Sequence, residues 1–159
     1  MKRLAALVAA ILIFGGFCVW WFSPTQVLKR RCRDLCQILT LDAGTAPASR
    51  TINSLQFDRL LQPNVEFDIP SISEANGNFD RIEINSAFTW LCNNAKETKF
   101  RIVRFDRIVI EGGHASVSAR LEARVLLPGA QVVDSLGDAT FIWKKTEDGW
   151  RLEKAGWRE

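Results

Sequence analysis

Apolar and polar residues alternate along residues 115–127, and this is the clearest periodicity in the chain. The positions between the apolar ones are polar as far as Arg124, as at Ser116, Arg120 and Glu122. Seven alternate positions are apolar: Ala115, Val117, Ala119, Leu121, Ala123, Val125 and Leu127. A period of two places one face of a strand in the core and the other in water. The pattern therefore predicts a half-buried strand of an antiparallel sheet.

Three further strands are predicted around this one. Residues 100–111 precede a Gly112-Gly113 turn, and their apolar residues fall on both parities, which predicts a β-bulge or burial on both faces. After a turn at residues 128–129, strands are expected from Ala139 to Trp143 and over residues 150–157, joined at Asp148-Gly149.

Helical signals lie before these strands. Ser23, Pro24 and Gln26 form a capping pattern, and apolar residues then recur at three- and four-residue steps, which predicts a helix of about 17 residues. A short helix is expected at residues 55–61 and ends at Pro63, between polar loops at 42–49 and 70–78. A short strand is expected at 65–69 between that helix and the second loop. Asp80 with Glu83 predicts the cap of a third helix.

The predicted order is helix, helix, short strand, helix and four antiparallel strands. This order indicates an α+β fold in which helices pack on one face of a curved antiparallel sheet. At 159 residues the chain is long enough for one such domain, over residues 24–159, behind a segment of residues 1–23.

The segment from Leu4 to Phe22 contains 19 uninterrupted apolar residues. At about 1.5 Å per residue, a helix of this length nearly spans a hydrocarbon core of about 30 Å. Trp20 and Trp21 close it with rings that favour the membrane interface. The run is longer than the apolar part of a secretory signal, and Phe17 stands where a lipoprotein signal needs a small residue before Cys18. We therefore expect an uncleaved single-pass transmembrane anchor, with a cleaved signal and a lipoprotein as alternatives.

Basic residues flank this segment on both sides. Lys2 and Arg3 precede it, and a basic cluster follows it: Lys29, Arg30, Arg31 and Arg33. The two flanks nearly balance under the positive-inside rule. A short N-terminal tail followed by a domain favours a domain on the extracytoplasmic side. The basic cluster is expected to be a solvated face beside the membrane and its anionic headgroups.

Composition narrows the function classes. The chain has 21 basic and 18 acidic residues, a net charge of +3, and the part after Phe22 is nearly neutral. This balance excludes a strongly basic nucleic-acid binder. The chain has one histidine and no tyrosine, which limits the catalytic options.

Two segments of the chain resemble the nuclear-transport-factor-2-like superfamily, also called SnoaL-like or cystatin-like. They are IVIEGGHASV, which begins at Ile108, and ATFIWKKTEDGWRL, which begins at Ala139. The resemblance covers most of residues 23–157 and implies a cone-shaped α+β barrel that can dimerise through its sheet. The superfamily includes isomerases, cyclases, dehydratases, ligand binders and assembly modules, and some members follow a single membrane helix, so the resemblance leaves function open.

An enzyme of this fold needs a polar group inside the cone, and the chain offers few candidates. The inward parity of residues 115–127 is wholly apolar, and the absence of tyrosine removes one kind of oxyanion donor. Asp106 is the one weak candidate for a buried acid, because its strand has mixed parity. His114 is expected to be an exposed turn residue rather than a base or a metal ligand. We therefore predict no catalytic residue, metal or cofactor.

Small residues on the curved sheet have two interpretations. They can leave a pocket for an apolar ligand, or they can allow a helix to approach closely. The candidate ligand-binding residues are Phe57, Phe67, Phe88, Leu91, Ala115, Ala119, Ala123, Phe141 and Trp143. An aromatic core would show the same pattern.

The cysteines have a structural and a covalent interpretation. Cys32, Cys36 and Cys92 lie on predicted apolar helix faces, which is typical of small buried hydrophobes. A disulfide from Cys92 to Cys32 or Cys36 is the alternative in an oxidising compartment. Zinc is not expected, because no C-x-x-C pair is present.

These observations favour a membrane-anchored, non-catalytic binding or assembly module. It would hold a protein partner or an apolar ligand near the membrane, and it could form a homodimer through the outer sheet face. The alternative is an isomerase, dehydratase or hydrolase-like enzyme that acts on an apolar or lipid-like substrate inside the cone. A third possibility is a subunit of a secretion or envelope complex.

Overall fold

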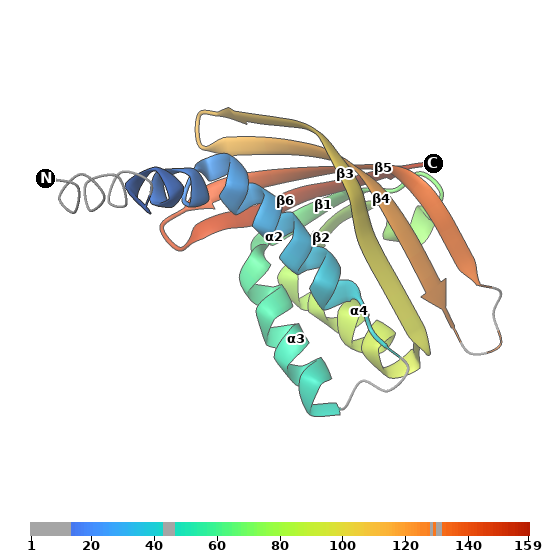
Figure 1. Ribbon diagram of the computed structural model, residues 1–159. Coiled ribbons are helices and arrows are strands. Elements are labelled where there is room, and N and C mark those ends of the chain that lie inside the picture. The colour runs from blue at the N-terminus through green and yellow to red at the C-terminus, as the bar shows by residue number, and fades with distance from the viewer. Residues whose placement is uncertain (1–13, 43–46, 128, 130–131) are drawn as a thin grey trace, which may run out of the picture.

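The computed structural model describes residues 14–42, 47–127, 129 and 132–159, and side chains of the 47–51 stretch are not described. Three helices cover one face of a strongly curved six-stranded sheet (Figure 1). The sheet order is β2-β1-β6-β5-β4-β3. This arrangement confirms the predicted α+β class with helices on one face of a curved sheet.

The last four strands form the predicted antiparallel meander. They are β3 (Glu97–Glu111), β4 (His114–Leu126), β5 (Val133–Thr146) and β6 (Gly149–Arg158). Along β4 the side chains of Ala115, Val117, Ala119 and Leu121 are buried, as the alternation predicts. Ala123 and Val125 are half-buried, and Leu127 lies just beyond the strand.

The mixed parity of β3 comes from two irregularities. Its register against β4 shifts between Ile102 and Arg104, and again between Phe105 and Arg107. Each extra residue moves the following side chains to the other face of the sheet. Phe105 thereby points inward opposite Ala119, and the predicted bulge is confirmed.

The first half of the sheet departs from the prediction. Leu61 and Pro63 belong to β1 (Leu61–Asp68) rather than to a helix and its end. β1 pairs in parallel with β6, and its register shifts between Leu61 and Glu66. Pro63 lies in that irregular stretch. Regular hydrogen bonding between β1 and β6 is interrupted there, so the N–H that proline lacks is not needed. A second strand, β2 (Gly77–Asp80), pairs with β1 and begins inside the predicted 70–78 loop.

Helix α2 (Pro24–Leu39) matches the predicted first helix, with Leu28, Cys32 and Leu35 on its buried face. Ser23, however, makes no side-chain capping bond. Residues 14–21 are already helical, and the Ser23 N–H donates to the Trp20 carbonyl. The predicted helix start at Ser23 and Pro24 is therefore confirmed, whereas the side-chain capping bond of Ser23 is absent.

Helix α3 (Pro47–Leu60) begins earlier than expected, inside the predicted 42–49 loop. Within α3, Leu55 is exposed, whereas Phe57 and Leu60 are buried. Helix α4 (Arg81–Asn94) has the predicted capping box, with Asp80 accepting from the Glu83 N–H at 2.8 Å and Glu83 accepting from the Asp80 N–H at 2.9 Å. A short 3-10 turn, η1 (Ser73–Ala75), precedes β2.

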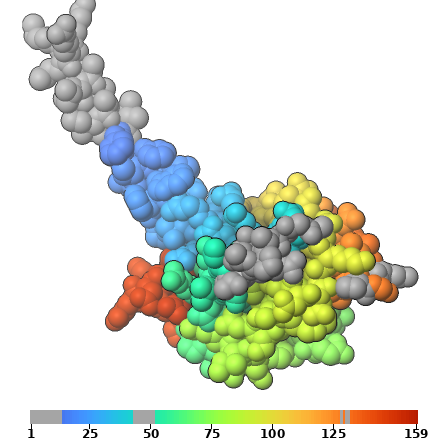
Figure 2. All heavy atoms as spheres, turned by 90° about the horizontal axis from the view of Figure 1, so that it is seen from below, coloured from blue at the N-terminus to red at the C-terminus, as the bar shows by residue number. Residues whose placement is uncertain are grey.

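The N-terminal helical residues project away from the domain (Figure 2). Among the described residues, none of the helices is both long and apolar enough to cross a membrane. Residues 4–13, which form the first half of the predicted anchor, lie outside the described residues. The anchor therefore stays a prediction.

Candidate functional site

The two polar residues considered for catalysis lie on the surface. The Asp106 carboxylate is 2.7 Å from Nε of Arg104 and is exposed on β3. His114 follows the β3–β4 turn, and its Nε2 lies 3.5 Å from the Glu153 carboxylate. The surface interpretation is confirmed for both residues, and neither points into the cone.

The predicted ligand-binding residues lie mainly in the core between sheet and helices. Their shared feature is close packing: the rings of Phe57 and Phe88 are 4.6 Å apart, and Trp143 is completely buried. Six are buried, namely Phe57, Phe88, Ala115, Ala119, Phe141 and Trp143. Phe67, Leu91 and Ala123 are half-buried. None of these nine residues borders the surface groove or the smaller hollow beside α2. Ligand binding by these residues stays a prediction.

One buried polar side chain stands out in the described part of the chain, that of Thr98. Its hydroxyl donates to the Leu39 carbonyl and accepts from the Leu41 N–H. Both hydrogen-bonding functions are thus used to fasten α2 to β3. A satisfied hydroxyl of this kind has no proton to exchange with a ligand.

The cysteines of α2 are buried free thiols. Burial raises the pKa of Cys32 to about 12, against a smaller opposing effect of the Trp143 indole N–H, and burial raises the pKa of Cys36 to about 12. Neither thiol forms the alternative disulfide to Cys92, so that interpretation is wrong for this structure. They are small buried hydrophobes, and a neutral thiol is a poor nucleophile and metal ligand. No group of metal-ligating side chains occurs within the described residues.

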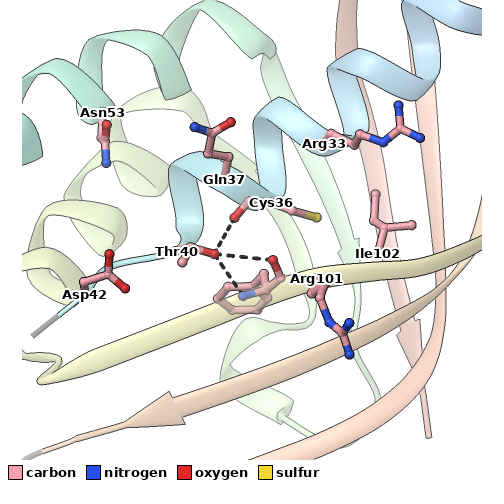
Figure 3. A pocket seen from close by; sticks show the side chains of 9 residues that line it. Arg33, Cys36, Gln37, Thr40, Asp42, Asn53, Arg101 and Ile102 are labelled. Carbon is pink, nitrogen blue, oxygen red and sulfur yellow. Dashed lines mark hydrogen bonds between the residues drawn. The ribbon is translucent and has the colours of Figure 1, made fainter.

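An open groove of about 560 Å³ lies between α2, β3 and α3 (Figure 3). Arg33 borders it from α2, Arg101 from β3 and Asn53 from α3. Thr40 closes its floor, accepting from the Phe100 N–H at 3.0 Å and donating to the Cys36 carbonyl at 2.8 Å. The remaining lining residues are Cys36, Gln37, Asp42, Phe100 and Ile102.

No sequence pattern indicates this groove, because its lining residues come from three separate segments of the chain. A smaller hollow of about 140 Å³ lies on the α3 side of α2, beside Asp34 and Gln56. Both hollows carry amide and charged groups, so they suit a polar ligand or a peptide backbone better than an apolar molecule.

The basic cluster of α2 forms a collar, which we define as Lys29, Arg30, Arg31 and Arg33. Lys29 and Arg33 both lie over one ring, that of Phe105, at 5.7 and 5.3 Å from its centre. Arg30 stacks on Trp21 at 4.6 Å and donates to its carbonyl at 2.9 Å. No member of the collar forms an ion pair with any residue that the structure describes.

The outer face of the sheet has a different electrostatic character. Several of its cations are paired, as in Arg120 with Asp138 at 2.8 Å and Lys154 with Glu66 at 2.6 Å. The hydrogen bond and charge of Arg101 lower the pKa of Glu122. These surface pairs contribute little stability each, but they neutralise this face.

The chain was compared with known proteins. No family model matches the sequence. No curated protein matches it either. Solved structures do match, among them a candidate scytalone dehydratase from Novosphingobium aromaticivorans, with a TM-score of 0.66, 12% identity, and coverage of 84% of this chain and 82% of that one. An NTF2-like protein from Cytophaga hutchinsonii matches with a TM-score of 0.61, 14% identity and coverage of 86% and 98%.

The chain has the NTF2-like fold. An NTF2-like superfamily protein from Salmonella enterica is similar to the same extent, with a TM-score of 0.60, 15% identity and coverage of 84% and 88%. At these identities the likeness concerns the fold alone. The NTF2-like cone is therefore confirmed, and its use in this chain depends on the residues described above.

Proposed function

We propose that this protein is a membrane-associated, non-catalytic binding module built on the NTF2-like fold. The observation that carries this proposal is the apolar surface of residues 14–22, which the domain leaves uncovered (Figure 2). Phe14 is 69% exposed and Phe22 is 70% exposed. Large apolar side chains are also exposed between them: Phe17, Val19, Trp20 and Trp21. A contiguous apolar surface of this kind is typical of a membrane or protein contact.

The sequence before these residues supports a membrane as the contact. The apolar run begins at Leu4, so the exposed aromatic residues are the end of a stretch of near-transmembrane length. Aromatic rings and then basic residues follow in the order expected from hydrocarbon through interface to water. The domain would lie on the extracytoplasmic side.

The interior supports a role without catalysis. Trp143, Phe57 and Phe88 fill the space between sheet and helices. The side chains described there include no carboxylate or imidazole, and Thr98 is already bonded to α2. A binding role would then use the surface, where the groove beside Arg33 offers charged and amide groups to a protein partner.

Membrane association is tested by placing charges in the exposed segment. Phe14→Arg with Phe17→Arg should move the full chain from the membrane fraction toward the soluble fraction, because each arginine costs about 2.5–3.5 kcal/mol in a membrane helix. Phe14→Leu with Phe17→Leu is the matched control and should stay in the membrane after an alkaline wash. Neither residue packs on the domain, so folding is preserved. A wild-type chain found wholly in the soluble fraction would refute the proposal.

An enzyme acting on an apolar substrate inside the cone is the second candidate. Its support is that fold neighbours include candidate dehydratases, such as one of the NTF2-like family from Streptomyces avermitilis with a TM-score of 0.60, 15% identity and coverage of 81% and 90%. Native mass spectrometry of the full chain in a mild detergent separates the two candidates. A retained small molecule would favour a pocket and this second candidate, whereas a ligand-free chain would favour the binding module.

A further inference from the structure

We propose that the basic collar of α2 is a binding surface for the phosphate headgroups of anionic lipids. This inference rests on the proposed membrane association and adds the lipid chemistry that the surface would recognise. Its centre is the pair formed by Lys29 and Arg33, which lie one helical turn apart on the side of α2 that faces β3.

The geometry holds two positive charges close together without a counter-charge. Both side chains lie over the Phe105 ring, so their charged groups are within about 11 Å of each other. The one acid on α2, Asp34, lines the hollow on the α3 side of the helix, together with Ile38 and Gln56. Among the described residues no acid lies within ion-pair distance of the collar, unlike the acids that pair with Arg120 and Lys154 on the sheet.

The Phe105 ring gives this pair a fixed position. A cation over an aromatic face is attracted by about 0.5–1 kcal/mol at an exposed site, which limits the motion of a long side chain before a ligand arrives. A phosphate group has several acceptor oxygens and forms charge-assisted hydrogen bonds of about 2.7–2.9 Å. Phosphate groups at this surface can therefore accept hydrogen bonds from Lys29 and Arg33 and offset the repulsion between the two cations.

The collar also lies next to the proposed membrane contact. Arg30 contacts Trp21, the aromatic residue at the end of the exposed segment, so the cations begin where the proposed membrane contact ends. Lys29 follows Phe22 by seven residues, or about 10 Å of helix. If Phe22 lies at the headgroup layer, the Lys29 backbone is about one Debye length away from that layer at physiological ionic strength. The attraction between its charge and anionic headgroups is therefore only partly screened. Figure 1 shows this end of α2 on the side where the β3–β4 and β5–β6 hairpins turn.

The experiment places the full chain in lipid nanodiscs that contain equal amounts of phosphatidylglycerol and phosphatidylcholine. Lipids retained on the released protein are counted by native mass spectrometry. We expect wild type to be enriched in phosphatidylglycerol. Lys29→Gln with Arg33→Gln should lower that enrichment by up to about 30-fold, about five-fold for each basic residue near an anionic surface. Lys29→Arg with Arg33→Lys should restore it.

Lys96→Gln with Lys99→Gln is the matched control, since both residues are exposed near the start of β3 and the net charge changes equally. Enrichment should persist in this variant, and an equal loss in both variants would show a general effect of charge and overturn the headgroup site. Wild type that enters the discs without enrichment would overturn the headgroup site alone. Wild type that fails to enter the discs would overturn both this inference and the proposed function.

Discussion

Leu41 and Thr98 exchange two backbone hydrogen bonds of 2.9 Å, which join the exit of α2 to the start of the edge strand β3. The Thr98 hydroxyl reinforces this link by donating to the Leu39 carbonyl at 2.5 Å and accepting from the Leu41 N–H at 3.0 Å. A buried side chain thus replaces the water that the last carbonyls of a helix otherwise require. This link holds α2, with its groove and collar, against the sheet.

Thr98→Val should lower the free energy of unfolding by about 1–3 kcal/mol, because the isosteric side chain keeps its packing and leaves the Leu39 carbonyl without its hydroxyl donor. Urea denaturation measures the change. Thr140→Val on the exposed face of β5 is the matched control and should have little effect. Equal stability of the two variants would show that the hydroxyl bond contributes nothing.

Ala119→Leu tests whether the small residues of β4 face packed core or empty space. Ala119 is buried opposite Phe105 and Ala139, so a larger side chain should cost about 1–3 kcal/mol through overpacking. Ser118→Leu, on the opposite face of the same strand, should cost less. If instead Ala119→Leu leaves the thermal midpoint unchanged, the site has room to spare and the predicted apolar pocket gains support.

Cys32 and Cys36 should resist alkylation in the folded chain at pH 8 and react once it unfolds. Burial raises the pKa of each thiol to about 12 from an ordinary value of 9.0. The stabilising effect of the buried neutral thiols is therefore complete below pH 9 and is lost as pH rises toward 12. Peptide mass mapping after a brief exposure to iodoacetamide measures this, with the urea-unfolded chain as the fully reactive comparison. Rapid labelling of Cys32 under native conditions would contradict the burial.

Homodimerisation through the outer sheet face stays a prediction. Arg120 and Glu122 lie at the centre of that face, where each pairs within the chain, with Asp138 and Arg101 respectively. If the face forms a dimer, Arg120→Ala with Glu122→Ala should shift the light-scattering mass toward the monomer. Ser116→Ala with Ser118→Ala on the same strand is the matched control. An unchanged dimer mass in the charge variant would exclude this face.

Local patterns predicted local structure well. The alternation along β4 and the Asp80–Glu83 capping box depend on residues a few positions apart, so each is visible in a short window of sequence. The mixed parity of β3 also indicated a bulge, although it did not locate the two register shifts. The helix start at Ser23 and Pro24 was also visible in a short window, although the Ser23 side chain forms no capping bond.

The pairing of distant segments was beyond these patterns. The parallel contact of β1 with β6 joins Phe67 to Ala155, and nothing in either short segment specifies that partner. The groove likewise combines side chains from α2, α3 and β3. Its residues show no periodic spacing in the sequence. Polar residues on an exposed helix face also have the same sequence pattern whether or not they line a hollow.

The amino-acid sequence by itself determined the α+β class, the antiparallel meander and the long apolar run before a basic cluster, since each follows from periodicity or composition within one segment. The tertiary structure decided that the aromatic residues fill the cone, that Asp106 and His114 face water, and that Lys29 and Arg33 share the Phe105 ring. The physical reason is that burial and charge pairing depend on which surfaces meet, and the folded sheet brings together residues far apart in the chain.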